Sequence, residues 1–483
     1  MKKLISIVCA VVIVLTLVAC DNTNAGSQNS DSTTATQPTD NSGSTTVAPA
    51  AIHEKVEDMK TAADWDALKT ETHTLTLDMI KGYFSEEVWR DLIDGFKADH
   101  PNWTIEEKMT DKLDPTTIQA RLLGGDKPTF AEFKTPDLPL TTLYSSGQLL
   151  PMAQLLDAPS YDSAGKTIRQ TLPSGVDTYK YQGIEYGVPY RYGANGFWYN
   201  VQMFEDHGWQ EPKTWDDLLK LCQDIKTAGI TPIMFTGTFA PYPFTMFVGP
   251  RMASLGGGRQ FMLDMCNLVD GSWSGAVNKQ AIEDLVNMRD KGYFTNEVLG
   301  TDYLLAQQMF FEGRAAMVLS GTWLEGEMKD SIPEGFRFNF MVPPVRQNSN
   351  DPGMLLATTM GWMLYNGSGQ EVAGMEFIRY IVSAKFEKIY AEKQGVPTVT
   401  NVDIQFDTDK MSPAALSIIN AVTAPDTVLM PGPSAYGDLY NNYCNGIIGV
   451  LAGNETIDNL LSKTEAAMQE VKKDDSIAKI EAY

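Results

Sequence analysis

The sequence predicts an α/β protein with a mostly parallel sheet and two lobes. Residues 72–110 read as a strand, a helix and a second strand with short connections, which is typical of a β-α-β unit. Residues 315–319 (AAMVL) form an apolar run that suits a strand buried on both faces. More than 400 residues of globular composition exceed what one hydrophobic core serves, so we expect two lobes.

The β-α-β unit follows from residue periodicity. Leu75, Leu77 and Met79 alternate with polar residues over 72–80, which is the period of a strand. Residues 86–100 carry apolar side chains at helical spacing, and residues 102–110 (NWTIEEKMT) predict the next strand.

Residues 212–229 predict a helix with clear ends. Thr214 is the expected N-cap with Asp217 three residues later, and Gly229 ends the helix. Cys222 lies on the apolar face of this helix, so we expect its thiol to be buried and inert.

Three later segments continue the alternation. Residues 278–294 predict a helix closed by Gly292. A helix ending near Gly313 leads into the apolar run at 315–319, and residues 369–390 predict one further helix with an apolar face.

Residues 1–19 have the features of a lipoprotein signal peptide. Two lysines precede an apolar run of sixteen residues, which is shorter than the roughly 20 residues that a membrane span needs. The run ends in LVAC and resembles a bacterial lipobox, so Cys20 is expected to carry lipid. The alternative is an ordinary signal peptide with a chance cysteine.

Residues 20–50 are expected to form a disordered tether behind the lipidated Cys20. Residues 21–50 contain no aromatic residue and almost no large aliphatic one, so they cannot bury enough surface to offset their ordering entropy. A flexible coil of this length reaches about 30 Å. We therefore expect an extracytoplasmic protein that touches the cell membrane only through its lipid anchor.

Charge and cysteine content exclude several classes of protein. The formal net charge is −23, or −25 once the two lysines of the leader are removed, so neither nucleic acid nor anionic lipid is an expected partner. Beyond Cys9 and Cys20 the chain holds Cys222, Cys266 and Cys444 without a CxxC motif, which argues against a disulfide framework.

The sequence contains no recognisable catalytic or metal-binding motif. Its four histidines are isolated, and HExxH, GxSxG and GxGxxG are absent. SYDSAGKT at 160–167 ends like a phosphate-binding loop but starts with Ser160 where that motif requires glycine. We predict no catalytic residue, metal or cofactor, although the paired carboxylates of a glycosidase leave no sequence signature.

The ordered motifs resemble bacterial extracellular solute-binding proteins of ABC importers, the large carbohydrate-binding group often called family 1. The matching pieces cover nearly all of residues 70–465: YSSGQLLPMAQLLD (144–157), YGVP (186–189), FWYN (197–200), TWDDLLKLCQDIKTAGITP (214–232), FFEGRAAMVLSGTW (310–323), PP (343–344), QGVPT (394–398) and LAGNETIDNLL (451–461).

This resemblance implies a two-lobed periplasmic-binding-protein-like fold with three interlobe crossings and a central ligand cleft. We place the crossings near Pro189, Ala315 and Ala357. The first lobe would then comprise residues 51–189 plus 315–356, and the second would comprise residues 190–314 plus 357–483. The resemblance also implies a carbohydrate ligand, ABC importer permease subunits as partners, and no enzymatic activity. We expect a monomer.

The stretch EYGVPYRYGANGFWYN at 185–200 suits a sugar site. A neutral sugar offers apolar C–H faces to aromatic rings and hydroxyls to polar side chains. Tyr190 is expected to point into the cleft mouth and Asn195 to bind a hydroxyl, while Gly193 and Gly196 let the backbone approach the ligand.

Further cleft candidates follow the predicted strands, and Trp323 also belongs to the GTW that matches the family. Trp198, Tyr199, Trp273 and Tyr303 are expected in the core. The remaining cleft candidates are Tyr83, Glu132, Phe239, Tyr242, Tyr436 and Asp438.

Two other classes of function stay open at this point. One is a binding protein for a non-sugar solute such as a polyamine or a peptide, or a partner of a sensor. A cationic solute would require several carboxylates in the cleft. The other is a surface enzyme such as a glycosidase.

Overall fold

A computed structural model describes residues 53–79, 85–110, 115–132, 140–172, 179–294, 296–394, 404–475, 477 and 479. Residues 51–483 form one compact unit, and every described helix and strand lies within it. The expected signal peptide and tether lie outside the described residues. Within those residues, no helix combines the length and apolar character that crossing a membrane requires.

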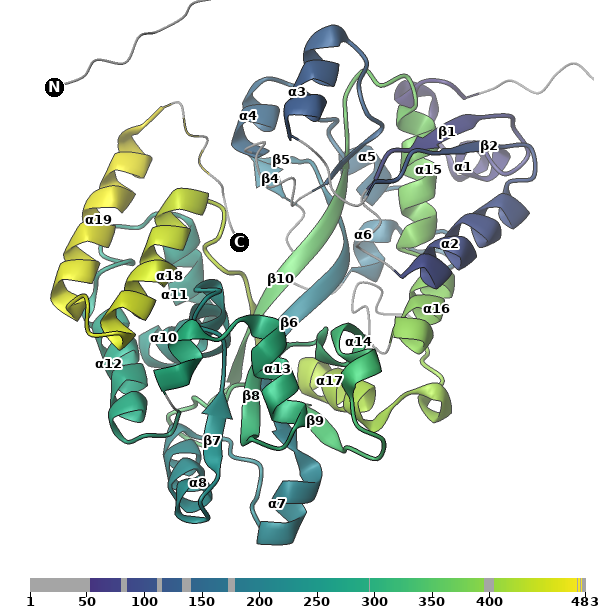
Figure 1. Cartoon of the computed structure of the whole chain (residues 1–483). Helices are drawn as coiled ribbons and strands as arrows, with labels where there is room; N and C mark the ends of the chain where they lie inside the picture. The colour runs from purple at the N-terminus through teal and green to yellow at the C-terminus, as the bar shows by residue number, and fades with distance from the viewer. Residues whose placement is uncertain are drawn as a thin grey trace, which may run out of the picture. The chain divides into compact units, whose positions relative to one another are not determined.

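Helices and strands alternate through most of the unit (Figure 1). The helices are α1 (Ala62–Ala67), α2 (Glu86–Asp99), α3 (Pro115–Gly124), α4 (Leu140–Ser145), α5 (Ala153–Leu156), α6 (Ile168–Thr171), α7 (Val201–His207), α8 (Trp215–Thr227), α9 (Pro241–Pro243), α10 (Gly249–Gly256), α11 (Arg259–Cys266), α12 (Ala276–Asp290), α13 (Tyr303–Phe311), α14 (Leu324–Glu327), α15 (Glu371–Ile381), α16 (Ala384–Gln394), α17 (Pro413–Thr423), α18 (Gly437–Leu451) and α19 (Ile457–Lys473).

The strands are β1 (Thr74–Leu77), β2 (Thr104–Glu107), β3 (Phe130–Glu132), β4 (Lys180–Tyr181), β5 (Ile184–Glu185), β6 (Val188–Asn200), β7 (Thr231–Met234), β8 (Ala315–Gly321), β9 (Phe338–Met341), β10 (Gly353–Leu364) and β11 (Thr427–Met430).

The main sheet is mixed rather than mostly parallel. Its path is β11-β10-β6-β8-β7, with β3 on β10 and β9 on β6. β7 with β8 and β10 with β11 are parallel pairs, but β6 is antiparallel to β8, β9 and β10. The expected β-α-β unit is confirmed, because β1 and β2 form a parallel pair on either side of α2.

The two largest of the three hydrophobic cores are joined by the long strands β6 and β10. The smaller core contains Trp362 of β10 together with side chains of α2 and α15, and the larger core contains Phe197 of β6 together with side chains of α8 and α12. Both strands supply side chains to both cores, and Figure 1 shows them running side by side through the centre of the unit.

This packing corrects the expected division into lobes. Residues 315–345 belong to the larger core with residues 194–310, because β8 pairs with β7 in parallel and with β6 in antiparallel fashion. No crossing lies near Ala315, since Phe311 and Met317 on either side of it share that core. Residues 372–390 pack in the smaller core and not with the second lobe.

The helix ends follow local side-chain chemistry. Thr214 and Asp217 form the capping box expected at the start of α8, with the Asp217 amide donating to Thr214 Oγ1 over 3.2 Å. Residues 369–390 form two helices instead of one. Ser383 caps the start of α16, since its Oγ accepts from the Phe386 amide over 3.2 Å, and the Asp162 carboxylate also accepts from the amides of Ala384 (3.1 Å) and Lys385 (2.7 Å).

Several expected core residues are buried. β8 is buried along its whole length, and Cys222, Trp198 and Trp273 are 0% exposed. Tyr199 and Tyr303 are partly buried and pack against the larger core. Burial raises the pKa of the Cys222 thiol well above its ordinary value, so this cysteine stays protonated and unreactive.

Candidate functional site

A cavity of about 420 Å³ lies beside β6 and β10 where these strands pass from one core to the other. Its floor comes from the two strands, and its walls come from the turns that follow β7, β8 and β11. The lining residues are Tyr179, Arg191, Gly193, Asn195, Phe239, Pro241, Tyr242, Thr245, Trp323, Leu356, Ala357, Thr359, Met360, Pro431, Gly432, Ser434 and Tyr440.

The strand pleat decides which β6 residues form the floor. Arg191, Gly193 and Asn195 share one face because alternate side chains of a strand point the same way. Asn195 is only 3% exposed, and its Nδ2 donates to the carbonyl of Leu356 over 3.0 Å. This bond fixes the carboxamide, so its oxygen has a defined direction for a hydroxyl donor.

Tyr179 braces the floor at an irregularity in the ladder. The register of β6 against β10 shifts between Met360 and Gly361. The Tyr179 ring lies so close to Gly187 and Gly361 that a Cβ on either glycine would meet it at 2.3 Å. Its hydroxyl donates to the carbonyl of Thr359 over 2.7 Å, although its own φ of 55° is rare for a residue with a side chain.

Aromatic rings form one wall of the cavity. The Trp323 and Tyr242 ring centroids are 6.1 Å apart, and Tyr242 meets Phe239 edge to face at 5.1 Å and 88°. Trp323 is placed by Gly321, since a Cβ there would meet its ring at 2.1 Å. Such rings offer flat apolar surfaces with little conformational freedom to lose.

The turn that carries Phe239 is fixed to the neighbouring segment at 298–301. Gly237 donates its amide to the carbonyl of Val298 over 2.7 Å, and Thr236 Oγ1 donates to the carbonyl of Thr301 over 2.9 Å. The amide of Phe239 in turn donates to Thr236 Oγ1 over 3.3 Å. The ring therefore stands on a well-held backbone.

Among the described lining residues, one side chain is positively charged and none is a carboxylate. Arg191 is its one charged residue, and the guanidinium donates to the Tyr390 hydroxyl over 2.8 Å. Burial, and after it the charge of Glu327, raise the pKa of the Tyr242 phenol, which stays neutral. Within the described residues, no group of histidine, cysteine, aspartate or glutamate side chains is arranged to hold a metal ion.

The structure brings four of the expected site residues together. Asn195, Phe239, Tyr242 and Trp323 all line the cavity, on segments far apart in the sequence. Whether they contact a ligand stays a prediction.

Tyr190 is placed differently from expectation. It is 3% exposed in the smaller core, and its ring stacks on Trp362 at 4.8 Å and 22°. Tyr190 directly precedes Arg191 on β6, and neighbouring side chains of a strand point to opposite faces. Its ring therefore lies on the other face from Arg191 and Asn195. Gly196 likewise packs against the Phe340 ring instead of opening the cavity to a ligand.

The other expected residues do not reach the described cavity lining. Tyr436 is 5% exposed in the larger core, and Asp438 is exposed in the first turn of α18. Glu132 pairs with Trp362 through the β3 backbone, and its side chain lies outside the described residues. Tyr83 also lies outside them.

The sequence did not indicate most of the residues that form the floor of the cavity and the wall after β11. Arg191 lies inside the aromatic stretch at 185–200, and Pro431 and Gly432 carry a turn signal. Tyr179 and Tyr440 carried no local signal, because only the fold places them beside the cavity.

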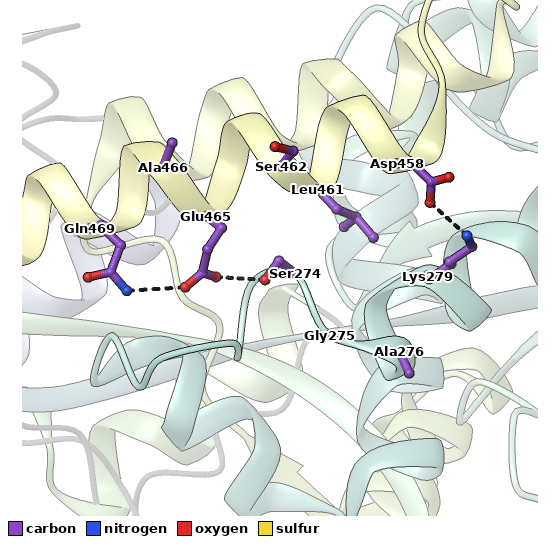
Figure 2. Close-up of a pocket in the computed structure, with 10 residues that line it drawn as sticks. All are labelled: Ser274, Gly275, Ala276, Lys279, Asp458, Leu461, Ser462, Glu465, Ala466 and Gln469. Carbon is purple, nitrogen blue, oxygen red and sulfur yellow. Dashed lines mark hydrogen bonds and ion pairs between the residues drawn. The ribbon is translucent and has the colours of Figure 1, made fainter.

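A second hollow, of about 550 Å³, lies between α19 and the residues that lead into α12 (Figure 2). Its polar side chains bind one another. Lys279 pairs with Asp458 at 2.6 Å, and Glu465 accepts from Ser274 Oγ at 2.8 Å and from Gln469 Nε2 at 3.2 Å. The described residues that line it include no aromatic ring, so the cavity at β6 and β10 is the better candidate for a solute site.

An α/β fold with two cores joined by long strands, and a cavity at the junction, is that of a two-lobed solute-binding protein. A sequence model of the bacterial extracellular solute-binding protein family matches residues 83–388, well over half of the chain. The chain belongs to this family. It is a binding protein and not an enzyme.

Named relatives and solved structures agree with this assignment. The chain is 25% identical over 373 residues to a diacetylchitobiose binding protein of Streptomyces coelicolor, covering 75% of this chain and 77% of that protein. It is 22% identical over 316 residues to a multiple sugar-binding protein of Streptococcus mutans, covering 63% and 70%. A solved chitin oligosaccharide binding protein has the same fold, with a TM-score of 0.63, 20% identity and coverage of 83% and 98%.

Proposed function

We propose that this protein captures a neutral sugar or oligosaccharide in the cavity at β6 and β10 and delivers it to the permease of an ABC importer. The observation that carries the proposal is the lining itself, where an aromatic wall faces a floor of amide, hydroxyl and guanidinium groups. Rings cover the C–H faces of a sugar and polar groups bind its hydroxyls. The relatives named above for diacetylchitobiose and for multiple sugars support the same class of ligand.

A polyamine is the less favoured solute. Such a cation requires carboxylates around it, and the described lining contains none while placing Arg191 on the floor.

The test is a thermal unfolding screen of residues 51–483, the compact unit that holds both cores. The panel contains N-acetylglucosamine, diacetylchitobiose, raffinose, galactose and tagatose, with spermidine and short peptides beside them. A ligand at 100 times its dissociation constant stabilises the folded state by about 2.7 kcal/mol, which raises the midpoint by several degrees. A shift with a sugar supports the proposal, and a shift with spermidine or peptide alone contradicts it.

Delivery to an importer has its own measurement. A strain that lacks the gene is expected to lose uptake of the sugar that binds, and the wild-type gene is expected to restore it. Unchanged uptake in the deletion strain would argue against the importer role.

We also propose that lipid on Cys20 holds the protein at the outer face of the cell membrane, with residues 21–50 as its tether. The support is the LVAC motif after a basic start and a sixteen-residue apolar run. Labelled palmitate is expected to enter the full chain and to be lost in Cys20→Ser. Cys9→Ser is the matched control and is expected to keep the label. Labelling that persists in Cys20→Ser would contradict the anchor.

A further inference from the structure

Phe239 stands out among the cavity residues because its ring is exposed. It is 47% exposed, whereas its neighbour Tyr242 is 9% exposed and Trp323 is half-buried. Leaving a phenylalanine in water forgoes the stabilisation that burial gives a side chain of this size. Trp323, Tyr242 and Phe239 thus form a wall of three linked rings, and Phe239 is the most exposed of them.

The exposed ring is held in place. Phe239 meets Tyr242 edge to face at 5.1 Å, and Tyr303 lies 6.4 Å from Phe239 and 6.2 Å from Tyr242, so the three rings form a triangle. The amide of Tyr242 donates to the carbonyl of Phe239 over 3.0 Å. Gly237 lies so close to Leu299 that a Cβ would meet its Cα at 2.6 Å, so the turn is packed tightly on the segment behind it.

A fixed, solvent-exposed ring beside a ligand cavity is a ready stacking surface. Its conformational freedom is already restricted before binding, so little further ordering is required when an apolar face covers it. The cavity volume of about 420 Å³ is towards the small end of ligand sites, which span about 300–1,000 Å³. A ligand longer than the enclosed space would therefore extend over the outermost ring of the wall.

Given the proposed function, on which this step rests, we infer that the solute is an oligosaccharide of at least two sugar rings and that Phe239 is the residue that selects for chain length. The inner rings of the wall, Trp323 and Tyr242, contact the sugar unit inside the cavity. Phe239 stacks on the unit that follows it at the mouth. A glycosidic linkage joins neighbouring sugar units directly. Successive units can therefore lie against successive aromatic rings of the wall.

The test compares chain lengths by calorimetry on residues 51–483. The probes are chitin oligomers and α-linked glucose oligomers, each of one to four units. Phe239→Ala is expected to weaken binding of oligomers of two or more units by about tenfold, and to leave single units unchanged. Phe239→Tyr keeps a ring and is expected to retain wild-type affinity at every length.

Leu304→Ala is the matched control. Leu304 is 45% exposed on α13, beside Tyr303 in sequence but absent from the cavity lining, so its removal takes a similar apolar area from the surface. It is expected to leave every affinity unchanged. The unfolding midpoints of the two alanine variants are expected to change by similar amounts, because Phe239 and Leu304 are exposed to nearly the same extent.

The outcomes separate this inference from the proposed function. If the wild type binds neither these oligomers nor any sugar of the unfolding screen, the proposed function fails and this inference fails with it. If single units bind as tightly as longer ones, or Phe239→Ala weakens all lengths equally, the inference is overturned while sugar binding stands. If Phe239→Ala keeps every affinity but abolishes uptake in cells, Phe239 is a contact for the importer and the inference is likewise overturned.

Discussion

Gly321 offers the sharpest test of the aromatic wall, because one added methyl group should displace Trp323. A Cβ at Gly321 would lie 2.1, 2.2 and 2.4 Å from three carbons of the indole ring. Carbon atoms pack at about 3.5–4.0 Å, so the ring would have to move by about 1.5 Å. The backbone cannot yield instead, since Gly321 pairs with Asn195 in the ladder and its carbonyl accepts from Trp198 Nε1 at 2.9 Å.

The displaced ring would lose its stacking position and enter the space of the ligand. A stacked aromatic surface of this size contributes about 1.5–3 kcal/mol, so Gly321→Ala is expected to raise the dissociation constant for the bound sugar about tenfold to hundredfold. Calorimetry with the sugar found in the screen measures this. The folded state should lose little stability, because the ring stands at an open cavity and can turn into it.

Two controls isolate the mechanism. At Gly300 a Cβ would meet nothing within 4 Å, so Gly300→Ala adds the same methyl group without a contact and should leave affinity unchanged. If Gly321 acts only through the ring, adding Gly321→Ala to Trp323→Ala should cause no further loss. Unchanged affinity in Gly321→Ala, or a full additional loss in the double variant, would refute the reasoning.

Two further predictions concern stability. His53 Nδ1 lies 2.6 Å from Glu71, and this hydrogen bond raises the pKa of His53 above 6.5; the stabilisation is therefore present below that pH and is lost as pH rises through the folded-state pKa. His53→Ala should lower the unfolding midpoint more at pH 5.5 than at pH 8.5, and an equal drop at both would contradict this. Arg379→Met should cost about 3 kcal/mol in denaturant unfolding, because the buried Glu376 loses its guanidinium partner at 2.9 Å and keeps only His100 Nε2 at 3.1 Å. Arg337→Met, which breaks an exposed pair with Glu205, should cost much less than Arg379→Met; similar losses in the two variants would count against the argument from burial.

Sequence patterns predicted the fold class and the elements whose signals are local. The capping box at Thr214 and the buried strand at 315–319 follow from spacing and composition alone, and both are present. The break between α15 and α16 was missed although Ser383 is a local N-cap, and the further cap from Asp162, more than two hundred residues away, has no local signal. The lobe division also depends on contacts between distant segments, since pairing of β8 with β7 is not visible in either segment.

Part of the candidate site could also be predicted from local sequence signals. Asn195 and Trp323 follow from aromatic and polar residues next to predicted strands. Tyr190 was misplaced because one position along a strand reverses the face, and the sequence does not state which face meets the cavity. Tyr179 depends on a left-handed backbone and on two glycines that come together only in the folded chain.

The floor of the cavity should tolerate fewer sequence changes than its walls. β6 and β10 pair with each other in a fixed register and supply side chains to both cores. A change in either strand therefore alters the architecture as well as the site. The walls are turns behind β7, β8 and β11, and turns accept insertions and new sequences without disturbing a ladder. A protein built this way can change its ligand specificity by exchanging short turns while the two strands stay the same. Replacing the turn at 236–243 is therefore the first change to make in a design that aims at a new ligand.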